Sequence, residues 1–228
     1  MTDIQERDPI TLAIEAFDKV YKITGANAKG LRSRLRTLPA LVQEAGLVTT
    51  LLFYASKTLG PSNLMKGKRD ALQIILACSS NMQEEKNKVK KIDVNEFDSA
   101  INYLLNIDRI KVGVLVQKER SEEQEDINFD INCLFNKIIQ QFGVANKEGG
   151  AYGIALALVI FGLIKLCPEV ESEIRDRCNE GIKLACLPKL FEKLRENKIN
   201  DCNEIKAMAV LEDYFITLKR LAEALIGD

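Results

Sequence analysis

The sequence contains no histidine and no tryptophan. Without histidine, the chain cannot form a Ser-His-Asp or Cys-His nucleophile pair, a histidine ligand set for zinc, or a histidine proton switch. Lysine, tyrosine, cysteine and carboxylate side chains remain as acid–base groups, but none of them forms a recognisable catalytic motif. We therefore expect a binding protein that has no catalytic residues, no cofactor and no metal.

The cysteines include no C-x-x-C pair, so their spacing excludes a zinc ribbon and a thioredoxin-type motif. Most of them stand among apolar residues in helical patterns. We expect buried thiols in a reducing cytoplasm, with one or two disulfide bonds as the alternative. The six positions are Cys78, Cys133, Cys167, Cys178, Cys186 and Cys202.

The start of the sequence lacks a basic segment followed by an apolar stretch, so we expect no signal peptide. One segment, residues 152–164, resembles a membrane helix. The uncharged run around it, residues 149–164, is shorter than the roughly 18 residues that a membrane span needs, and Glu148 and Lys165 close it. We interpret it as the buried core helix of a soluble, cytoplasmic protein that makes no membrane contact.

Helix signals occur along most of the chain. Asp8 can cap a helix that begins at Pro9, and Pro39 can begin another because proline is tolerated in the first turn. Asp93 and Glu96 have the spacing of a capping box. The patterns predict helices over residues 9–24, 28–36, 39–58, 63–79, 94–107, 130–142, 152–164, 168–185 and 203–226, with a shorter one from Pro188.

The middle of the chain is more polar and less regular. Residues 83–91 are charged, and residues 117–126 indicate a loose connection. Residues 110–116 are rich in β-branched side chains and fit either a short strand or a helix, and we assign a helix. We therefore predict an all-α helical bundle with a polar, partly irregular intermediate segment. It forms one domain, made of N-terminal basic helices (residues 1–63), an expanded intermediate region (64–150) and C-terminal helices (151–228).

Positive charge is concentrated in one part of the sequence. Between Lys19 and Arg69 there are ten basic residues and one acid, Glu44, which gives a net charge of +9 in a chain whose total is −1. The rest of the chain therefore carries −10. Such polarity is typical of a phosphate-facing surface on an otherwise acidic protein.

The densest basic stretch is Arg32-Ser33-Arg34-Leu35-Arg36. On a helix, Arg32 and Arg36 lie on one face, being four residues apart. Arginine side chains match phosphate oxygens in pairs, so such a face can hold a nucleic-acid backbone without reading bases. The alternative interpretation is a solvated helix face that carries charge for solubility.

A second basic group, Lys66, Lys68 and Arg69, follows nearby and favours the binding interpretation. Residues 60–69 have some features of a nucleotide-binding P-loop. However, the lysine-bearing glycine stands seven residues after the first glycine, farther than the motif allows, and arginine occupies the position that requires Ser or Thr. Nucleotide hydrolysis is therefore not expected.

Two motifs, one in the first quarter of the chain and one near its end, point to a known family. The first runs through Leu38-Pro39, Gly46-Leu47, Thr50-Leu51, Phe53 and Lys57. It resembles the signature of the small subunit of the Cmr complex, the type III-B CRISPR effector, with its Leu-Pro, Gly-Leu and Thr-Leu-x-Phe-x-x-x-Lys pattern.

The second motif, residues 218–225, is similar to the terminal helix of the same family, with Lys219 and Arg220 in a Leu-Lys-Arg sequence. Two positions depart from the family pattern. Lys206 stands where the family has arginine, and Thr217 stands where it usually has tryptophan.

The resemblance covers roughly residues 10–59 and 151–227. It implies an all-helical subunit of an antiviral complex, without a catalytic centre, whose copies stack as an inner filament along guide RNA and target RNA beside other Cmr-type subunits. A sequence-independent grip suits such a protein, because base pairing supplies the specificity. The candidate RNA-binding residues are Arg32, Arg34, Arg36, Lys57, Lys66, Lys68, Arg69, Lys206, Lys219 and Arg220.

Several of these residues also have a structural interpretation. Lys57 could extend into solvent, and Lys219 and Arg220 could complement the negative end of the last helix. Leu51 and Phe53 are expected in the core.

Two other functions stay open. A helical protein–protein adaptor would use the basic block to dock an acidic partner. A metal-dependent nuclease would use the carboxylates Glu122, Glu123, Glu125 and Asp126, which we expect in a run too loose to hold a metal.

Overall fold

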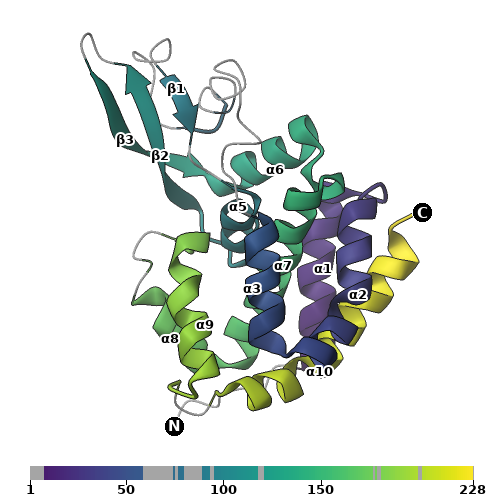
Figure 1. Cartoon of the computed structure of the whole chain (residues 1–228). Coiled ribbons are helices and arrows are strands. Elements are labelled where there is room, and N and C mark those ends of the chain that lie inside the picture. Colours follow the sequence, from purple (N-terminus) through teal and green to yellow (C-terminus); the bar gives the residue numbers. More distant parts are fainter. Residues whose placement is uncertain are drawn as a thin grey trace.

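The computed structural model describes residues 8–58, 74, 77–79, 89–92, 95–117, 121–176, 178, 181–199 and 202–227. In these parts of the chain the helices form a bundle, and three strands form a small sheet that projects from it (Figure 1). The predicted, mainly helical fold class is confirmed.

The helices are α1 (Pro9–Thr24), α2 (Lys29–Ala45), α3 (Leu47–Thr58), α5 (Glu96–Leu104), α6 (Ile131–Phe142), α7 (Glu148–Leu166), α8 (Pro168–Arg175), α9 (Leu187–Arg195) and α10 (Glu204–Leu225). Two 3-10 turns, η2 (Val144–Asn146) and η3 (Leu184–Cys186), and the strands β1 (Val89–Ile92), β2 (Arg109–Gln117) and β3 (Glu122–Asp130) complete the order.

The first and last helices form as the sequence predicts. Asp8 caps α1, because its carboxylate accepts the Thr11 N–H at 2.9 Å. Asn203 caps α10 by accepting the Lys206 N–H at 2.8 Å. These caps satisfy backbone N–H groups that the first turn of a helix leaves unpaired.

Helix α7 is the central helix of the bundle. Its residues 150–164 are all buried, and it packs against α1, α2, α3, α5 and α10. The buried Tyr214 of α10 donates its hydroxyl proton to the Leu158 carbonyl at 2.7 Å. This approach needs Gly162, since a Cβ there would stand 2.6 Å from the Tyr214 ring. By length and composition α7 could cross a membrane, but 83% of its most apolar stretch is buried inside the protein, so the prediction of a core helix is confirmed.

The predicted helix boundary at Pro39 is wrong. α2 continues through Pro39, and the chain turns at Gly46, where φ is 85°. A left-handed φ is easy for glycine and costly for other residues, so Gly46 sets the break. α3 then begins at Leu47 and is capped from the far end of the chain, since the Glu204 carboxylate accepts the Val48 N–H at 2.9 Å.

A sheet occupies the segment where we predict a helix followed by a loose connection. Residues 110–116 belong to β2, whose side chains alternate between buried and half-buried positions, as a strand with one covered face requires. β3 pairs with β2 antiparallel, from Arg109↔Asp130 to Gln117↔Glu122, and β1 pairs with the other edge of β2. The β-branched composition of β2 favoured a strand, and pairing with β3 provides the backbone hydrogen bonds.

Helix α5 is shorter than predicted and has a different cap. Asn95 accepts the Asp98 N–H at 2.8 Å and so caps α5. Asp93, the predicted capping residue, lies outside the described residues, as does most of the predicted helix over residues 63–79.

Two disulfide bonds form, contrary to the prediction of free thiols and in agreement with its alternative. They join Cys78 to Cys133 and Cys178 to Cys186. Cys167 and Cys202 are free and buried. Because Cys78 and Cys133 are 55 residues apart in the sequence, it is the fold that brings this pair together.

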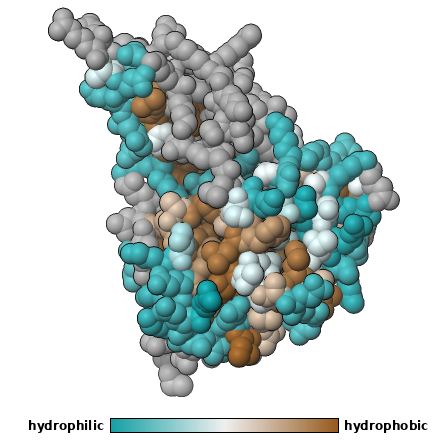
Figure 2. All heavy atoms as spheres, in the orientation of Figure 1, coloured by the Kyte–Doolittle hydropathy of each residue, from teal (hydrophilic) through white to brown (hydrophobic). Residues whose placement is uncertain are grey.

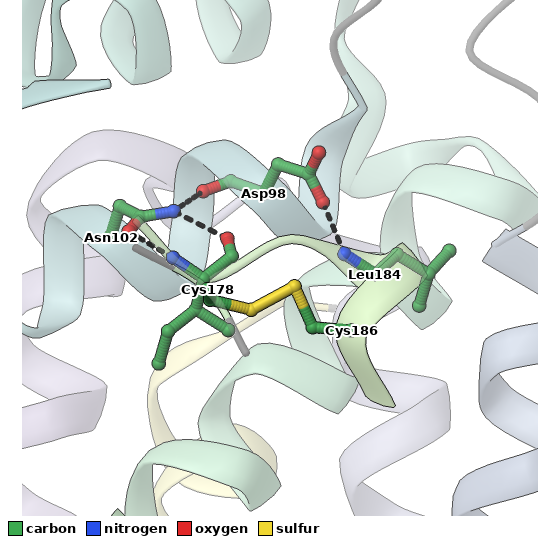
Figure 3. The surroundings of a disulfide bond; sticks show 6 residues. Asp98, Asn102, Cys178, Leu184 and Cys186 are labelled. Carbon is green, nitrogen blue, oxygen red and sulfur yellow. Dashed lines mark hydrogen bonds between the residues drawn. A yellow bond between two sulfur atoms is a disulfide. The ribbon is translucent and has the colours of Figure 1, made fainter. Parts of the chain in front are cut away.

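The Cys178–Cys186 bond lies in an irregular segment that α5 holds in place (Figure 3). Asn102 of α5 donates to the Ile182 carbonyl at 2.7 Å and accepts the Ile182 N–H at 2.9 Å. One turn earlier, the Asp98 carboxylate accepts the Leu184 N–H at 2.8 Å. These polar side chains satisfy backbone groups that no helix or strand satisfies.

Candidate nucleic-acid interface

The three arginines of α2 point to two sides of the helix. At about 100° per residue, Arg32 and Arg36 lie in one row with Pro39, which lines a shallow groove between α2 and α10. Arg34 lies on the opposite flank. Its guanidinium group stands over the ring of Tyr152 on α7, 4.2 Å from the ring centroid. The triplet therefore contributes to two separate surfaces.

Helices α2 and α10 lie side by side in opposite directions. The second half of α2 and residues 208–216 of α10 form the groove, with Pro39 on one side and Phe215 on the other. The other ends meet where the Gly227 N–H donates to the Ala26 carbonyl at 2.9 Å. The first half of α2 is therefore level with the last third of α10, and both segments are basic.

Lys219 lies in the row of α10 that faces α2, because it follows the groove residue Phe215 by about one helical turn. It is half-buried, and Arg220 beside it is exposed. Arg32 and Arg36 lie in the corresponding row of α2. We call Arg32, Arg36 and Lys219 the seam patch, to which Arg220 adds a fourth positive charge.

On the other flank of α2, two cations stand beside aromatic rings. Arg34 covers Tyr152, and the Lys57 Nζ lies 5.9 Å from the centroid of Phe53. Phe53 meets Tyr152 edge to face, with 5.5 Å between the ring centroids. Phe53 is 40% exposed, whereas Tyr152 is buried. We call Arg34, Phe53, Lys57 and Tyr152 the aromatic patch.

Tyr54 lies beneath the aromatic patch and fixes its geometry. Its ring meets Tyr152 edge to face at 5.0 Å, and its hydroxyl donates to the Arg34 carbonyl at 3.0 Å. Burial raises the pKa of Tyr54 above its ordinary value, so the hydroxyl stays protonated and keeps donating. The hydrogen bond ties α3 to the turn of α2 that carries Arg34.

The cations of the aromatic patch remain available to an anionic ligand. The Lys57 Nζ lies 3.6 Å from the Glu148 carboxylate, and the two side chains are 45% and 64% exposed. An exposed pair of this kind contributes only about 0–1 kcal/mol, so a phosphate can displace Glu148. Arg34 is half-buried, and because its Nε is covered, a ligand would meet the terminal N–H groups of its guanidinium.

Of the remaining candidate residues, the structure describes Lys206, which does not join either patch. Lys206 is exposed near the start of α10, about 20 Å along the helix from Lys219 at the usual rise per residue. Lys66, Lys68 and Arg69 lie outside the described residues.

Lys19, from the same charged part of the sequence, makes structural contacts. Its Nζ donates to the Leu104 carbonyl at 3.2 Å and to the Asn106 Oδ1 at 2.8 Å. Partial burial lowers the pKa of Lys19. Net charge along the sequence therefore overstates the number of cations that face a ligand.

The predicted position of Phe53 is wrong. We predicted it in the core, but it is 40% exposed, whereas its neighbour Leu51 is buried as predicted. The buried residues of α3 include Leu47, Leu51, Tyr54 and Thr58. These follow one another at helical spacing, and Phe53 falls outside their row. The signal was present in the sequence, because residues two apart on a helix stand about 200° apart around its axis, so Leu51 and Phe53 cannot both face the core.

The carboxylates that a nuclease would need lie on a strand instead of in a loose run. They belong to β3, which the sequence analysis did not predict. Among the residues that the structure describes, no group of three or more His, Cys, Asp or Glu side chains is placed to hold a metal ion. The four carboxylates are Glu122, Glu123, Glu125 and Asp126.

A family of known proteins matches the part of the chain that contains α2 and α3. Residues 11–119 match the family model described as CRISPR-associated protein (Cas_Cmr5). A curated relative, the CRISPR system CMR subunit Cmr5 of Saccharolobus solfataricus, is 26% identical over 160 residues, which cover 65% of this chain and 94% of the relative. No solved structure matches the chain significantly.

Proposed function

We propose that the chain, which matches the Cmr5 family model over residues 11–119, is a non-catalytic small subunit of a type III-B CRISPR effector complex. In this role it binds the backbone of guide RNA and target RNA without reading their sequence. It acts in the cytoplasm with other Cmr-type subunits and with further copies of itself, which stack as an inner filament.

The RNA-binding part of the proposal is supported by the seam patch. Its two arginines can each pair with phosphate oxygens through two N–H groups, and Lys219 adds a compact charge. Contacts of this kind position a protein on nucleic acid but carry no sequence information. They suit a subunit that must accept any target, because guide–target pairing selects the sequence.

The assembly part of the proposal is supported by the similarity to a subunit of a CMR system. Exposed apolar side chains give such contacts a surface to cover: Ile205 on α10 is 79% exposed, and Ile10 and Ile14 on α1 are 46% and 48% exposed. Burial of apolar area is the usual driving force for association.

Neutralising the seam patch is expected to weaken RNA binding through its salt dependence. The variant carries Arg32→Gln, Arg36→Gln and Lys219→Gln, which keep most of each side chain's apolar length. Each lost phosphate contact should lower the slope of log affinity against log salt by about 0.7–0.9, so three contacts should lower it by about 2–3. Fluorescence anisotropy with single-stranded and duplex RNA over a range of salt concentrations measures this slope.

A matched control removes the same charge from another face. Lys189, Arg195 and Lys198 are exposed on or just after α9, and their replacement by glutamine is expected to leave the slope nearly unchanged. An equal effect of both variants would show that only net charge matters. An affinity that does not respond to salt in the parent protein would instead favour the adaptor function, with the basic block docking an acidic protein.

A further inference from the structure

The exposed side of α3 carries apolar side chains where a solvated helix carries polar ones. Leu52 is 45% and Phe53 is 40% exposed. Figure 2 shows an apolar area over α3 in the middle of this face, surrounded by polar residues. The opposite row of α3 already packs into the core, so these two side chains are available to a ligand.

The surroundings of the two side chains differ in charge. Leu52 lines a hollow whose lining also includes two acids and one cation, Asp98, Asp126 and Lys183, which gives it a formal net charge of −1. Phe53 instead has Lys57 5.9 Å from its centroid, and it touches the Tyr152 ring over which Arg34 stands. The surroundings of Phe53 therefore suit an aromatic group joined to an anion, whereas those of Leu52 do not.

We propose that Phe53 stacks against an unpaired base of bound RNA, while Arg34 and Lys57 hold the phosphates on either side of that base. The inference rests on the proposed function and adds a contact with the bases to the grip on the backbone. Every base presents a π face, so stacking needs no particular sequence. Edge-to-face contacts with Tyr54 and Tyr152 hold the Phe53 ring in place before RNA binds.

The test compares protein variants on two RNAs with the same phosphates. One is single-stranded oligouridine, and the other has the same length but abasic residues in place of the uridines. Phe53→Ala is expected to weaken binding to oligouridine by about tenfold and to leave binding to the abasic RNA unchanged. Phe53→Tyr, which keeps the ring, is expected to bind like the parent. Leu52→Ala is the matched control, exposed to a similar degree one residue away, and should change neither affinity.

Three outcomes separate this inference from the proposal on which it rests. Equal affinity of Phe53→Ala and the parent for oligouridine would overturn the stacking role and leave backbone binding intact. An equal loss on both RNAs would also overturn it, because the substitution would then act on the phosphate contacts. Failure of the parent to bind either RNA would reject the proposed function itself. Thermal melting of each variant, measured in parallel, reports whether it is folded.

Discussion

Leu51→Ala is expected to lower the free energy of unfolding by about 2–5 kcal/mol, the usual result of emptying a buried leucine site. Leu51 is 1% exposed and belongs to the row of α3 that faces the bundle. α7 crosses this row and is buried along most of its length, so the cavity has little room to collapse. Denaturant unfolding followed by circular dichroism measures the change.

Phe53→Ala, two residues away on the same helix, is the matched comparison. We expect it to cost about 1 kcal/mol, because the ring keeps much of its exposure in the folded protein and loses mainly its edge-to-face contacts. A loss as large as that of Leu51→Ala would contradict the placement of Phe53 on the surface. It would also remove the aromatic patch as a ligand site.

Glu96→Gln is expected to stabilise the protein by about 3 kcal/mol at pH 8 and to have little effect at pH 4. Glu96 lies at the start of α5 and is only 6% exposed. Burial raises the pKa of Glu96 from 4.5 to about 7, and a hydrogen bond from its own backbone N–H and the charge of Lys147 offset only part of this rise.

The raised pKa of Glu96 fixes the direction of the pH dependence. Between pH 4.5 and about 7 the unfolded chain releases this proton while the folded protein keeps it, so rising pH favours unfolding. The stability contributed by protonated Glu96 is complete below pH 4.5 and is lost as the pH rises through 7. Glutamine cannot ionise, so the variant should lack this loss.

Unfolding free energies at pH 4, 6 and 8 test the role of Glu96. Glu15→Gln, which removes a carboxylate from the exposed side of α1, is the matched control. If the parent and Glu96→Gln show the same pH profile over this range, the carboxyl group is not buried in the way that the structure shows.

The parts of the fold that could be predicted are those with local signals. Asp8 and Asn203 accept hydrogen bonds from N–H groups two or three residues away, and the buried run of α7 is apolar throughout. These features can be recognised without knowing how the rest of the chain folds. The sheet could not be predicted from local signals, because the backbone N–H and C=O groups of β2 form their hydrogen bonds with β3, another segment of the chain. The disulfide between Cys78 and Cys133 depends on the fold for the same reason.

The candidate site was predictable in part. The arginine triplet is an obvious basic signal, and the period of the helix alone separates Arg34 from Arg32 and Arg36. What the sequence cannot show is the neighbour of each side chain. Tyr152 reaches Arg34 from α7, and α10, which carries Lys219, packs along α2, so both surfaces depend on how distant helices pack.

The most direct test of the account is to locate bound RNA on the protein by photo-crosslinking. RNA that contains 4-thiouridine is bound at low salt and irradiated, and the crosslinked residues are identified by mass spectrometry. Crosslinks are expected in α2, at residues 53–57 of α3 and in the last third of α10. Crosslinks confined to the β2–β3 hairpin or to α8 and α9, with RNA shown to be bound, would contradict this expectation.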